Sequence, residues 1–296
     1  MELWTAWEER SWEHRHRLKL PAFFPILKKI FHTWKIQRQL QANYRFISSN
    51  PYIYKSENYP DSFLSKVIKQ TTFIIDKNPV PRKIYTFWTG NNPMSESRQS
   101  HFELLKLVSG VEVVLITPNN LSEYILPEYP LHHAFKYLSL VHKADYLRCY
   151  FMHHYGGGYS DIKAAQYNWS PVFDTLDCSN AYFIGYPEIK AEDLAPVEGK
   201  IGEDMQCYFS IIAGNSAYIF RKQTPFTQEW YNELLNRMDN YAEQLKNNPG
   251  NVLGNNPGYP IPWTNILGDI FHPLCLKYTD KILLDNTLRP NLENYR

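Results

Sequence analysis

The sequence predicts an α/β fold with a mixed or parallel central sheet. Short, apolar, β-branched runs alternate with longer stretches of helical periodicity, which is the pattern of strands and helices packed in layers. The chain has 296 residues, of which 44% are hydrophobic, so it is long enough to bury a large core. This composition excludes intrinsic disorder and a small disulfide-stapled domain.

The elements are expected in the following order. Strands are predicted at residues 83–88, 111–116, 181–186, 207–213, 217–221 and 281–284. Helices are predicted near 62–70, at 97–109, 120–126 and 131–155, from 224 to about 246, and near 264–278. Gly110 ends the helix at 97–109, and Thr224-Pro225 supplies a capping residue and a first-turn proline for the helix that follows. The run at 111–116 is dense in β-branched residues, which favours a buried strand.

The chain is expected to contain a basic amphipathic helical arm (1–50), a connection (51–80) and a main domain (81–296). Residues 14–56 carry nine Lys or Arg and no acid, whereas the rest of the chain beyond them carries more acids than bases. Such an asymmetry predicts a polyanionic partner for the arm.

The segment 15–38 has the pattern of an interfacial membrane anchor. It contains seven Lys or Arg and no acid, together with the apolar residues Phe23, Phe24, Ile26, Leu27, Ile30, Phe31 and Trp34. A basic helix with an apolar face suits an anionic membrane surface. The alternative is that this face packs on the main domain and the basic residues are simply solvated.

Several common functional motifs are absent. The sequence contains no P-loop, no GxGxxG, no GxSxG elbow and no HExxH. Its four cysteines (Cys149, Cys178, Cys207 and Cys275) form no CxxC pair, so we expect reduced thiols in a cytosolic protein. The N-terminus lacks the apolar h-region of a signal peptide. No apolar run approaches the roughly 20 residues that a membrane-spanning helix needs.

The most informative segment runs from His142 to Lys163. Asp145 and Arg148 lie three residues apart on an expected helix and therefore share a face. Three glycines (156–158) then turn the chain, and a short strand delivers Asp161 at its end. Ligands of open α/β sheets bind at the carboxyl ends of strands, and this side-chain set suits a ligand with phosphates and hydroxyls. The alternative is a surface ion pair and an aspartate in a turn.

These residues resemble the DXD-region signature of glycosyltransferases with a GT-A fold. The matching positions are Ala144-Asp145, Arg148, Met152, Gly156-Gly157, Tyr159 and Asp161-Ile162-Lys163, and Pro81–Trp88 resembles the opening strand of the same enzymes. The chain is most similar to the families that include bacterial capsular polysaccharide synthesis proteins and yeast initiating mannosyltransferases. The resemblance covers about residues 80–285. It implies a GT-A type nucleotide-sugar-binding fold with a mixed central sheet flanked by helices, plus the N-terminal helical arm.

The resemblance implies roles for the motif residues. Trp88 would lie in the nucleotide pocket, Asp145 would hold hydroxyls, and Arg148 would contact the donor sugar or the diphosphate. Asp161 would face the ribose and a divalent cation, Mn²⁺ or Mg²⁺. Lys163 stands where the family has a second metal-binding aspartate. An ammonium cannot bind a cation, so either the cation is lost or its ligands come from elsewhere.

Further candidates lie outside the central motif. With Asp161 and Lys163, Asp204 is expected to be catalytic, because it precedes a predicted strand and could face the acceptor or act as a base. Asn215, next to Ser216, is expected to contact the donor, and His272 or Asp269 could reach the diphosphate. The alternatives are a solvated loop acid for Asp204, a turn for Asn215, and structural roles for the other two.

The resemblance therefore implies a hexosyltransferase-like glycosyltransferase. It would move a sugar, with retention of configuration, from a nucleotide-diphosphate sugar to a hydroxyl of a bacterial surface glycan such as capsular polysaccharide, free or lipid-linked. We expect a cytoplasmic protein, peripheral on the inner membrane face. One alternative is a non-catalytic sugar-nucleotide-binding or scaffold member of a capsule-assembly complex. Another, a nucleic-acid-binding protein, is disfavoured because the main domain is acidic, so we expect no nucleic-acid partner.

Overall fold

The computed structural model describes residues 23–65 and 78–291. The chain divides into two compact units, Met1–Ala42 and Asn43–Arg296. In the first unit the structure describes the helix α2 (Phe23–Ser49), which begins there and ends in the second unit. Among the described helices, none combines the length and the apolar character needed to cross a membrane.

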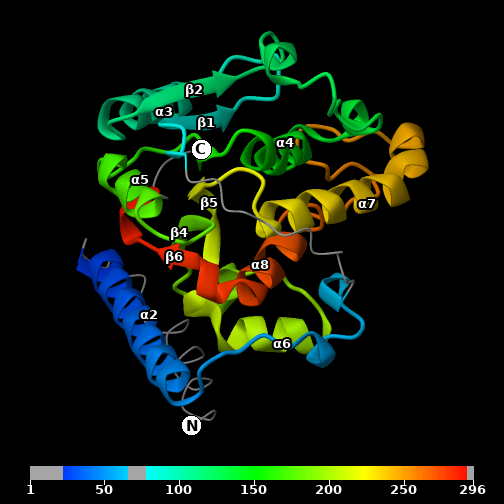
Figure 1. The fold of residues 1–296 in the computed structure, drawn as a ribbon. Helices are drawn as coiled ribbons and strands as arrows, with labels where there is room; N and C mark the ends of the chain where they lie inside the picture. The colour runs from blue at the N-terminus through cyan, green and yellow to red at the C-terminus, as the bar shows by residue number, and fades with distance from the viewer. Residues whose placement is uncertain (1–22, 66–77, 292–296) are drawn as a thin grey trace, which may run out of the picture. The chain divides into compact units, whose positions relative to one another are not determined.

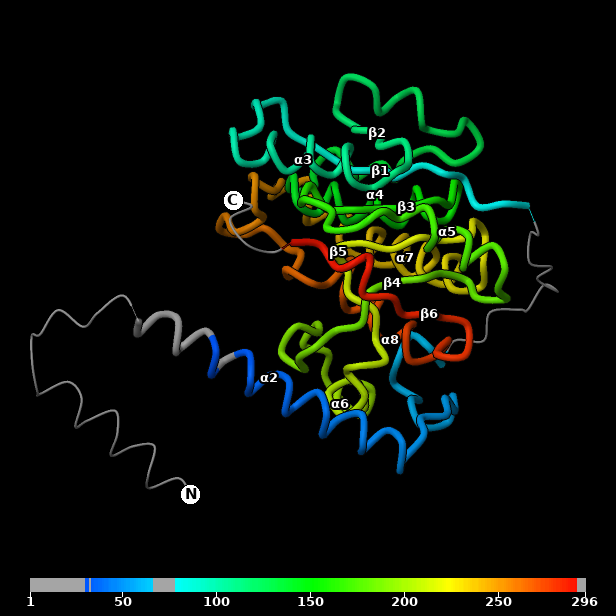
Figure 2. The backbone as a smooth tube through the Cα atoms, turned by 90° about the vertical axis from the view of Figure 1, so that its left-hand side faces the viewer, coloured from blue at the N-terminus to red at the C-terminus, as the bar shows by residue number. Residues whose placement is uncertain are grey.

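The second unit is built around a six-stranded mixed sheet in the order β2-β1-β3-β5-β4-β6 (Figures 1 and 2). The strands are β1 (Lys83–Phe87), β2 (Glu112–Ile116), β3 (Gly157–Ser160), β4 (Phe183–Pro187), β5 (Ala213–Phe220) and β6 (Ile282–Leu284). Strand β1 runs parallel to both β2 and β3, and β6 runs parallel to β4. Strand β5 is antiparallel to β3 and to β4. The predicted α/β class with a mixed sheet is therefore confirmed.

Helices cover both faces of this sheet. In the second unit they are α3 (Glu96–Val108), α4 (Leu140–His154), α5 (Ser170–Asp177), α6 (Gly199–Cys207), α7 (Pro225–Asn247) and α8 (Gly268–Lys277). Figure 1 shows α5 on one side of the sheet and α4, α7 and α8 on the other. Three of them begin at an N-cap hydroxyl that accepts a backbone N–H: α3 at Ser95, α4 at Ser139 and α7 at Thr224.

Alternation along the strands sends side chains to two separate cores. On the α5 side, aliphatic residues of the sheet pack with the start and body of α5: Ile84, Ile184, Ala217, Ile219, Trp169, Phe173 and Leu176. On the other side the core is aromatic, with rings of the strands against rings of α4, α7 and α8: Tyr85, Phe87, Phe183, Tyr218, Phe220, Phe151, Phe226, Trp230 and Phe271.

Some predicted elements were wrong. The expected strand at 207–213 is the end of α6 followed by a 3₁₀ turn at Phe209–Ile211, and β5 begins only at Ala213. The expected helix at 131–155 starts late, because Ser139 caps α4 and a separate 3₁₀ turn precedes it. The strand at 111–116 lies at the sheet edge and is only partly buried. Helices α5 and α6 were not predicted, and most of the helix expected near 62–70 lies outside the described residues.

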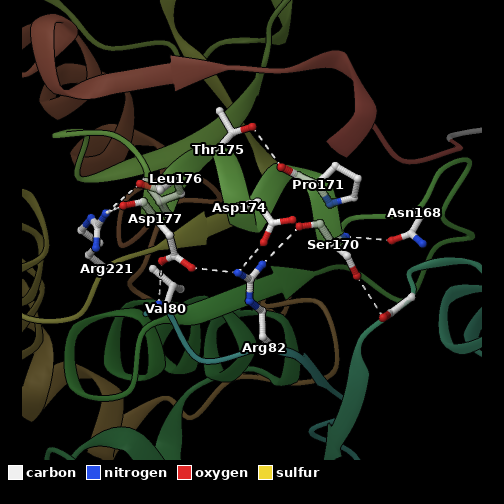
Figure 3. A network of polar contacts seen from close by, with 11 residues as sticks. Val80, Arg82, Asn168, Ser170, Pro171, Asp174, Thr175, Leu176, Asp177 and Arg221 are labelled. Atoms are coloured by element: carbon white, nitrogen blue, oxygen red, sulfur yellow. Dashed lines mark hydrogen bonds and ion pairs between the residues drawn. The ribbon is translucent and has the colours of Figure 1, made fainter. Parts of the chain in front are cut away.

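Two arginines join the ends of α5 to the sheet (Figure 3). The buried Arg221 guanidinium donates to the carbonyls of Leu176 and Ser179 at 2.7 and 3.2 Å, at the C-terminus of α5. A cation there satisfies helix carbonyls that have no intrahelical partner. Arg82, just before β1, pairs with Asp174 and Asp177 at 2.6 and 2.8 Å, but its side chain is 39% exposed.

We predict unequal costs for removing these two arginines. Arg221→Met leaves several buried carbonyls without a donor and should lower the free energy of unfolding by about 2–4 kcal/mol. Arg82→Met breaks solvent-screened ion pairs and should cost about 1 kcal/mol or less. Urea denaturation of both variants measures the difference. An Arg82→Met cost equal to or above that of Arg221→Met would contradict the assignment.

Candidate functional site

The first half of the candidate site comes from α4. Its N-cap, Ser139, accepts the backbone N–H of His142 at 3.1 Å and so fixes where the helix begins. Asp145 and Arg148 then lie one turn apart on the same face, with an Oδ1 to Nη2 distance of 3.4 Å. Both side chains are largely buried, at 5% and 12% exposure. The predicted shared face is confirmed, but the pair lies in the interior rather than at the surface.

The glycine turn after α4 brings β3 close to its neighbours. Gly156 and Gly157 have φ of 67° and 85°, in the region that favours glycine. A Cβ on Gly156 would also come within 2.9 Å of the Phe220 carbonyl oxygen and the Lys222 nitrogen. Glycine is therefore required here on both counts, and the turn delivers β3 directly between β1 and β5.

Asp161, immediately after β3, lies between two cations. Its Oδ1 is 3.1 Å from Arg148 Nη2, and its Oδ2 is 2.9 Å from Lys163 Nζ. The Tyr159 hydroxyl donates to Oδ1 at 2.5 Å, and the Arg148 guanidinium lies 4.8 Å from the Tyr159 ring centroid. The structure thus brings Asp145, Arg148, Asp161 and Lys163 into one cluster of two acids and two bases.

The environment of each carboxyl group sets the direction of its pKa. Burial alone would raise the pKa of Asp161, but Arg148, Lys163 and the Tyr159 hydroxyl outweigh it and hold that pKa well below its usual range. Burial raises the pKa of Asp145, and the attraction of Arg148 opposes the shift only in part. Asp161 is therefore the ionised partner of the two cations. Neutralising it would leave two buried cations poorly compensated.

The cluster has one partly open side. The Asp161 side chain is 20% exposed, compared with 8% for Lys163, so solvent reaches the cluster mainly at Asp161. Within it, Arg148 Nε is buried and has no hydrogen-bond partner. A buried donor without a partner is costly, and an arriving acceptor such as a phosphate oxygen would relieve that cost.

Residues of strand β5 and helix α8 hold the two cations of the cluster in position. Arg148 Nη1 donates to the Asn215 carbonyl oxygen at 3.1 Å, and Lys163 Nζ donates to Ser216 Oγ at 3.2 Å. The Asn215 side chain lies 2.9 Å from His272 Nε2. Asn215 and Ser216 therefore belong to a strand that holds both cations, and they do not form a turn.

His272 has a fixed tautomer. Its Nδ1 accepts the Ala195 backbone N–H at 3.0 Å, and burial lowers its pKa to about 3, so the ring is neutral and its proton is on Nε2. The Nε2–H must then donate to the side-chain oxygen of Asn215, which leaves the Asn215 amide NH₂ pointing away from His272. This neutral ring positions Asn215 and supplies no positive charge for a diphosphate.

Glu188 was not singled out from the sequence. It follows β4 directly and is buried, and burial together with Asp193 raises its pKa to about 8, against the opposing attraction of Arg289 and Lys163. The signal was available, because a strand was predicted to end at Tyr186 and strand-end carboxylates are the expected ligand-binding groups of such a sheet.

Trp88 and Asp204 are engaged in other contacts. Trp88 follows β1, is half-buried, and donates its ring N–H to the Asn92 carbonyl at 2.7 Å. Asp204 lies on α6, and not ahead of a strand, where its carboxylate accepts the Tyr59 hydroxyl at 2.6 Å and pairs with Lys200. Trp88 is at the same sheet edge as Asp161, whereas these contacts tie Asp204 to the segment before β1.

The donor set around Asp161 does not fit a divalent cation. Its Oδ1 faces Arg148 and Tyr159, and its Oδ2 faces Lys163, so both oxygens are engaged by hydrogen-bond donors. Across the described parts of the chain, no group of three or more His, Cys, Asp or Glu side chains could hold a metal ion. The positive charge beside Asp161 is the ammonium of Lys163.

We predict that Glu188 makes the stability of the protein depend on pH. Its pKa is near 4.5 in the unfolded chain and about 8 in the folded one, so the folded state holds the extra proton between these values. The free energy of unfolding should therefore fall as the pH rises through this window, by up to about 1.4 kcal/mol per unit of pKa shift. Glu188→Gln should lack this fall. Denaturation curves at several pH values compare the two proteins, and parallel pH profiles would refute the prediction.

Comparison with known protein families supports the importance of this region. Residues 29–203, more than half of the chain, match the family described as capsular polysaccharide synthesis protein. The match contains the four charged residues of the cluster, Asp145, Arg148, Asp161 and Lys163, and ends within α6. No curated protein matches the chain. With a family match of this extent, the chain belongs to the capsular polysaccharide synthesis protein family.

Proposed function

We propose that the chain is a glycosyltransferase with a GT-A type donor site, which transfers a sugar from a nucleoside diphosphate sugar to a hydroxyl of capsular polysaccharide or a similar glycan. The observation that carries this proposal is the cluster of Asp145, Arg148, Asp161 and Lys163 at the carboxyl ends of β1 and β3. Membership of the capsular family supports a glycan as the acceptor. The activity would belong at the cytoplasmic face of the membrane, where lipid-linked glycans are extended.

The charges of the cluster suit the chemistry of a departing nucleoside diphosphate. In the transfer, the bond between the anomeric carbon and the diphosphate oxygen breaks, and negative charge develops on the diphosphate. Arg148 and Lys163 are positioned before any ligand arrives, so they stabilise this charge without reorganisation. Asp161 is the partly exposed acceptor for a ribose or sugar hydroxyl. The acceptor hydroxyl bonds to the anomeric carbon and gives its proton to the departing diphosphate oxygen, with retention of configuration as the resemblance implies.

Lys163 supports transfer without a divalent cation. In the proposed mechanism its ammonium offsets diphosphate charge as a point charge, from the position where related enzymes have a metal-binding carboxylate. The cation lies 2.9 Å from Asp161, so the ion pair keeps both side chains oriented until a diphosphate arrives.

We predict that the protein binds a nucleoside diphosphate and cleaves its sugar donor in excess EDTA. Thermal shift against UDP, GDP, CDP, ADP and dTDP identifies the base, since a bound ligand raises the melting temperature by mass action. Release of that diphosphate from its sugar conjugates then measures activity. Lys163→Met should weaken binding by about tenfold or more, the effect of losing one charge-assisted contact. Lys281→Met, which removes a partly exposed lysine outside the cluster, is the matched control.

The outcomes separate the alternatives. Loss of turnover in EDTA that Mn²⁺ restores would overturn the metal-free mechanism. Binding without any release of diphosphate, even with capsular glycan present, would favour the non-catalytic member of a capsule-assembly complex. No shift with any nucleoside diphosphate would contradict the donor site itself.

The helix α2 supports attachment to an anionic membrane. Ile30, Phe31 and Trp34 are 59%, 65% and 54% exposed, so this apolar face is open in the structure. The Phe31 and Trp34 ring centroids are 5.9 Å apart, and the Arg38 guanidinium lies 5.4 Å from the Trp34 ring centroid. Leu40, on the opposite face of the helix, is buried. Exposed aromatic residues beside cations are what an interfacial helix presents to a lipid surface.

We predict that the full-length protein sediments with phosphatidylcholine vesicles that contain phosphatidylglycerol, and much less with phosphatidylcholine alone. Each basic residue near an anionic surface contributes about 1 kcal/mol, and the exposed rings add apolar burial. Replacing both Phe31 and Trp34 by Ser should release the protein, whereas replacing the exposed Gln37 and Gln39 by Ser should not. Equal sedimentation of the two double variants, or none by the wild type at low salt, would refute the anchor.

A further inference from the structure

A cavity of about 830 Å³ lies beside the candidate site, in the second unit. Its walls come from the segment 58–65, from residues 196–201 at the start of α6, from Glu233 and Arg237 of α7, and from residues 262–273 around the start of α8. Figure 1 shows α6 and α8 next to each other, with the turns before residue 65 alongside. The volume is within the range of roughly 300–1,000 Å³ typical of small-molecule sites.

Two acceptor atoms in this cavity wall have no hydrogen-bond partner. They are Asn265 Oδ1 and Asp269 Oδ1, and both are buried. The Asn265 amide NH₂ donates to the other Asp269 oxygen at 3.4 Å, and because a carboxylate only accepts, this contact fixes which Asn265 atom is the oxygen. Buried acceptors without a donor are costly, so the wall is suited to a ligand that brings donors.

The cations of the cavity wall are already committed. Arg237 pairs with Glu233 at 2.9 Å, donates to the Asn265 carbonyl at 2.5 Å, and lies 5.5 Å from the Phe63 ring centroid. Lys200 pairs with Asp204. The wall has four acids (Asp61, Glu198, Glu233 and Asp269) and two bases (Lys200 and Arg237), so it favours hydroxyl donors and disfavours a phosphate or a carboxylate.

The rest of the wall is mixed. Its apolar part is formed by the rings and short aliphatic groups of Tyr59, Phe63, Pro196, Val197, Pro262 and Pro273, and its polar part includes Asn58, Asp61, Ser62, Ser65, Glu198 and Thr264. Sugar rings present C–H faces as well as hydroxyls, so a wall with apolar surfaces and a few acceptors matches a saccharide better than a flat heterocycle or an ion.

Helix α8 connects the cavity to the charged cluster. Asp269 faces the cavity, and His272, one turn later, contacts Asn215, whose carbonyl accepts from Arg148. The helix start is closely packed, because a Cβ on Gly268 would lie 2.8 Å from Ala195 Cβ and 3.6 Å from the side-chain amide of Asn215. The cavity and the cluster are therefore linked through one turn of α8 and Asn215.

We infer that this cavity is the acceptor subsite, which binds a neutral, hydroxyl-rich saccharide through Asp269 and Asn265. The inference rests on the proposed function and deepens it, because it assigns the two substrates to two surfaces that differ in charge. The diphosphate belongs to the cationic cluster of Arg148 and Lys163, and the acceptor glycan belongs to the acceptor-lined cavity at the start of α8.

The test uses saturation-transfer NMR on the full-length protein with oligosaccharides from partial hydrolysis of the capsule of the strain that carries this chain. The neutral fraction should bind, and the uronic-acid fraction should bind much more weakly. Asp269→Ala should weaken binding by about tenfold, the effect of one hydrogen bond to a charged group. Val197→Trp, which fills the cavity without removing a hydrogen-bonding side chain, should abolish it. The surface control Asp280→Ala should leave it unchanged, and melting temperatures check that each variant is folded.

The inference fails if the neutral fraction does not bind, or if binding is unchanged in folded Asp269→Ala and Val197→Trp. Its failure is distinguishable from failure of the proposed function by a parallel thermal shift with the nucleoside diphosphate. A nucleotide shift without Asp269-dependent saccharide binding overturns the acceptor subsite alone. Asp269-dependent saccharide binding without any nucleotide shift leaves the cavity a glycan site and overturns the donor assignment.

Discussion

The placement of Asp161 between Arg148 and Lys163 is the constraint on which the rest of the structure depends. A buried carboxylate needs cations or donors at both oxygens, and here one cation comes from α4 and the other from the chain just beyond β3. Bringing these two cations to Asp161 requires the glycine turn between α4 and β3. It also requires strand β5, whose residues contact both cations. Asp161 therefore helps to hold the fold together as well as being a candidate ligand-binding residue.

The same arrangement links the two proposed substrates. The cations are held from behind by Asn215 and Ser216 of β5, and Asn215 is held by the neutral His272 of α8. One turn earlier, α8 contributes Asp269 to the cavity. Helix α8 thus contributes to both the cationic donor side and the acceptor-lined glycan side of the proposed site. That division places each substrate by charge and hydrogen-bonding capacity, without requiring a metal ion at the cluster.

The sequence predicted those parts that local chemistry determines. The cap at Thr224, the end of the helix before Gly110, and the shared face of Asp145 and Arg148 follow from short-range rules, and they are confirmed. The predicted strand at 207–213 was wrong because its apolar residues pack from a helix end and a 3₁₀ turn, which periodicity over so short a run does not distinguish. The position of Glu188 after a predicted strand was a local signal, but its burial and the cavity depend on tertiary contacts between distant segments, which no local pattern indicates.

The central claim is that the Lys163 ammonium takes the place of a divalent cation beside Asp161. The most direct measurement is calorimetric titration of the nucleoside diphosphate into wild type and Lys163→Asp, each in EDTA and in Mn²⁺. The wild type should bind equally well in both conditions, whereas Lys163→Asp should bind only in Mn²⁺, because a second carboxylate replaces the cation with a metal-binding pair. Wild-type binding that requires Mn²⁺, or Lys163→Asp binding that persists in EDTA, would contradict it.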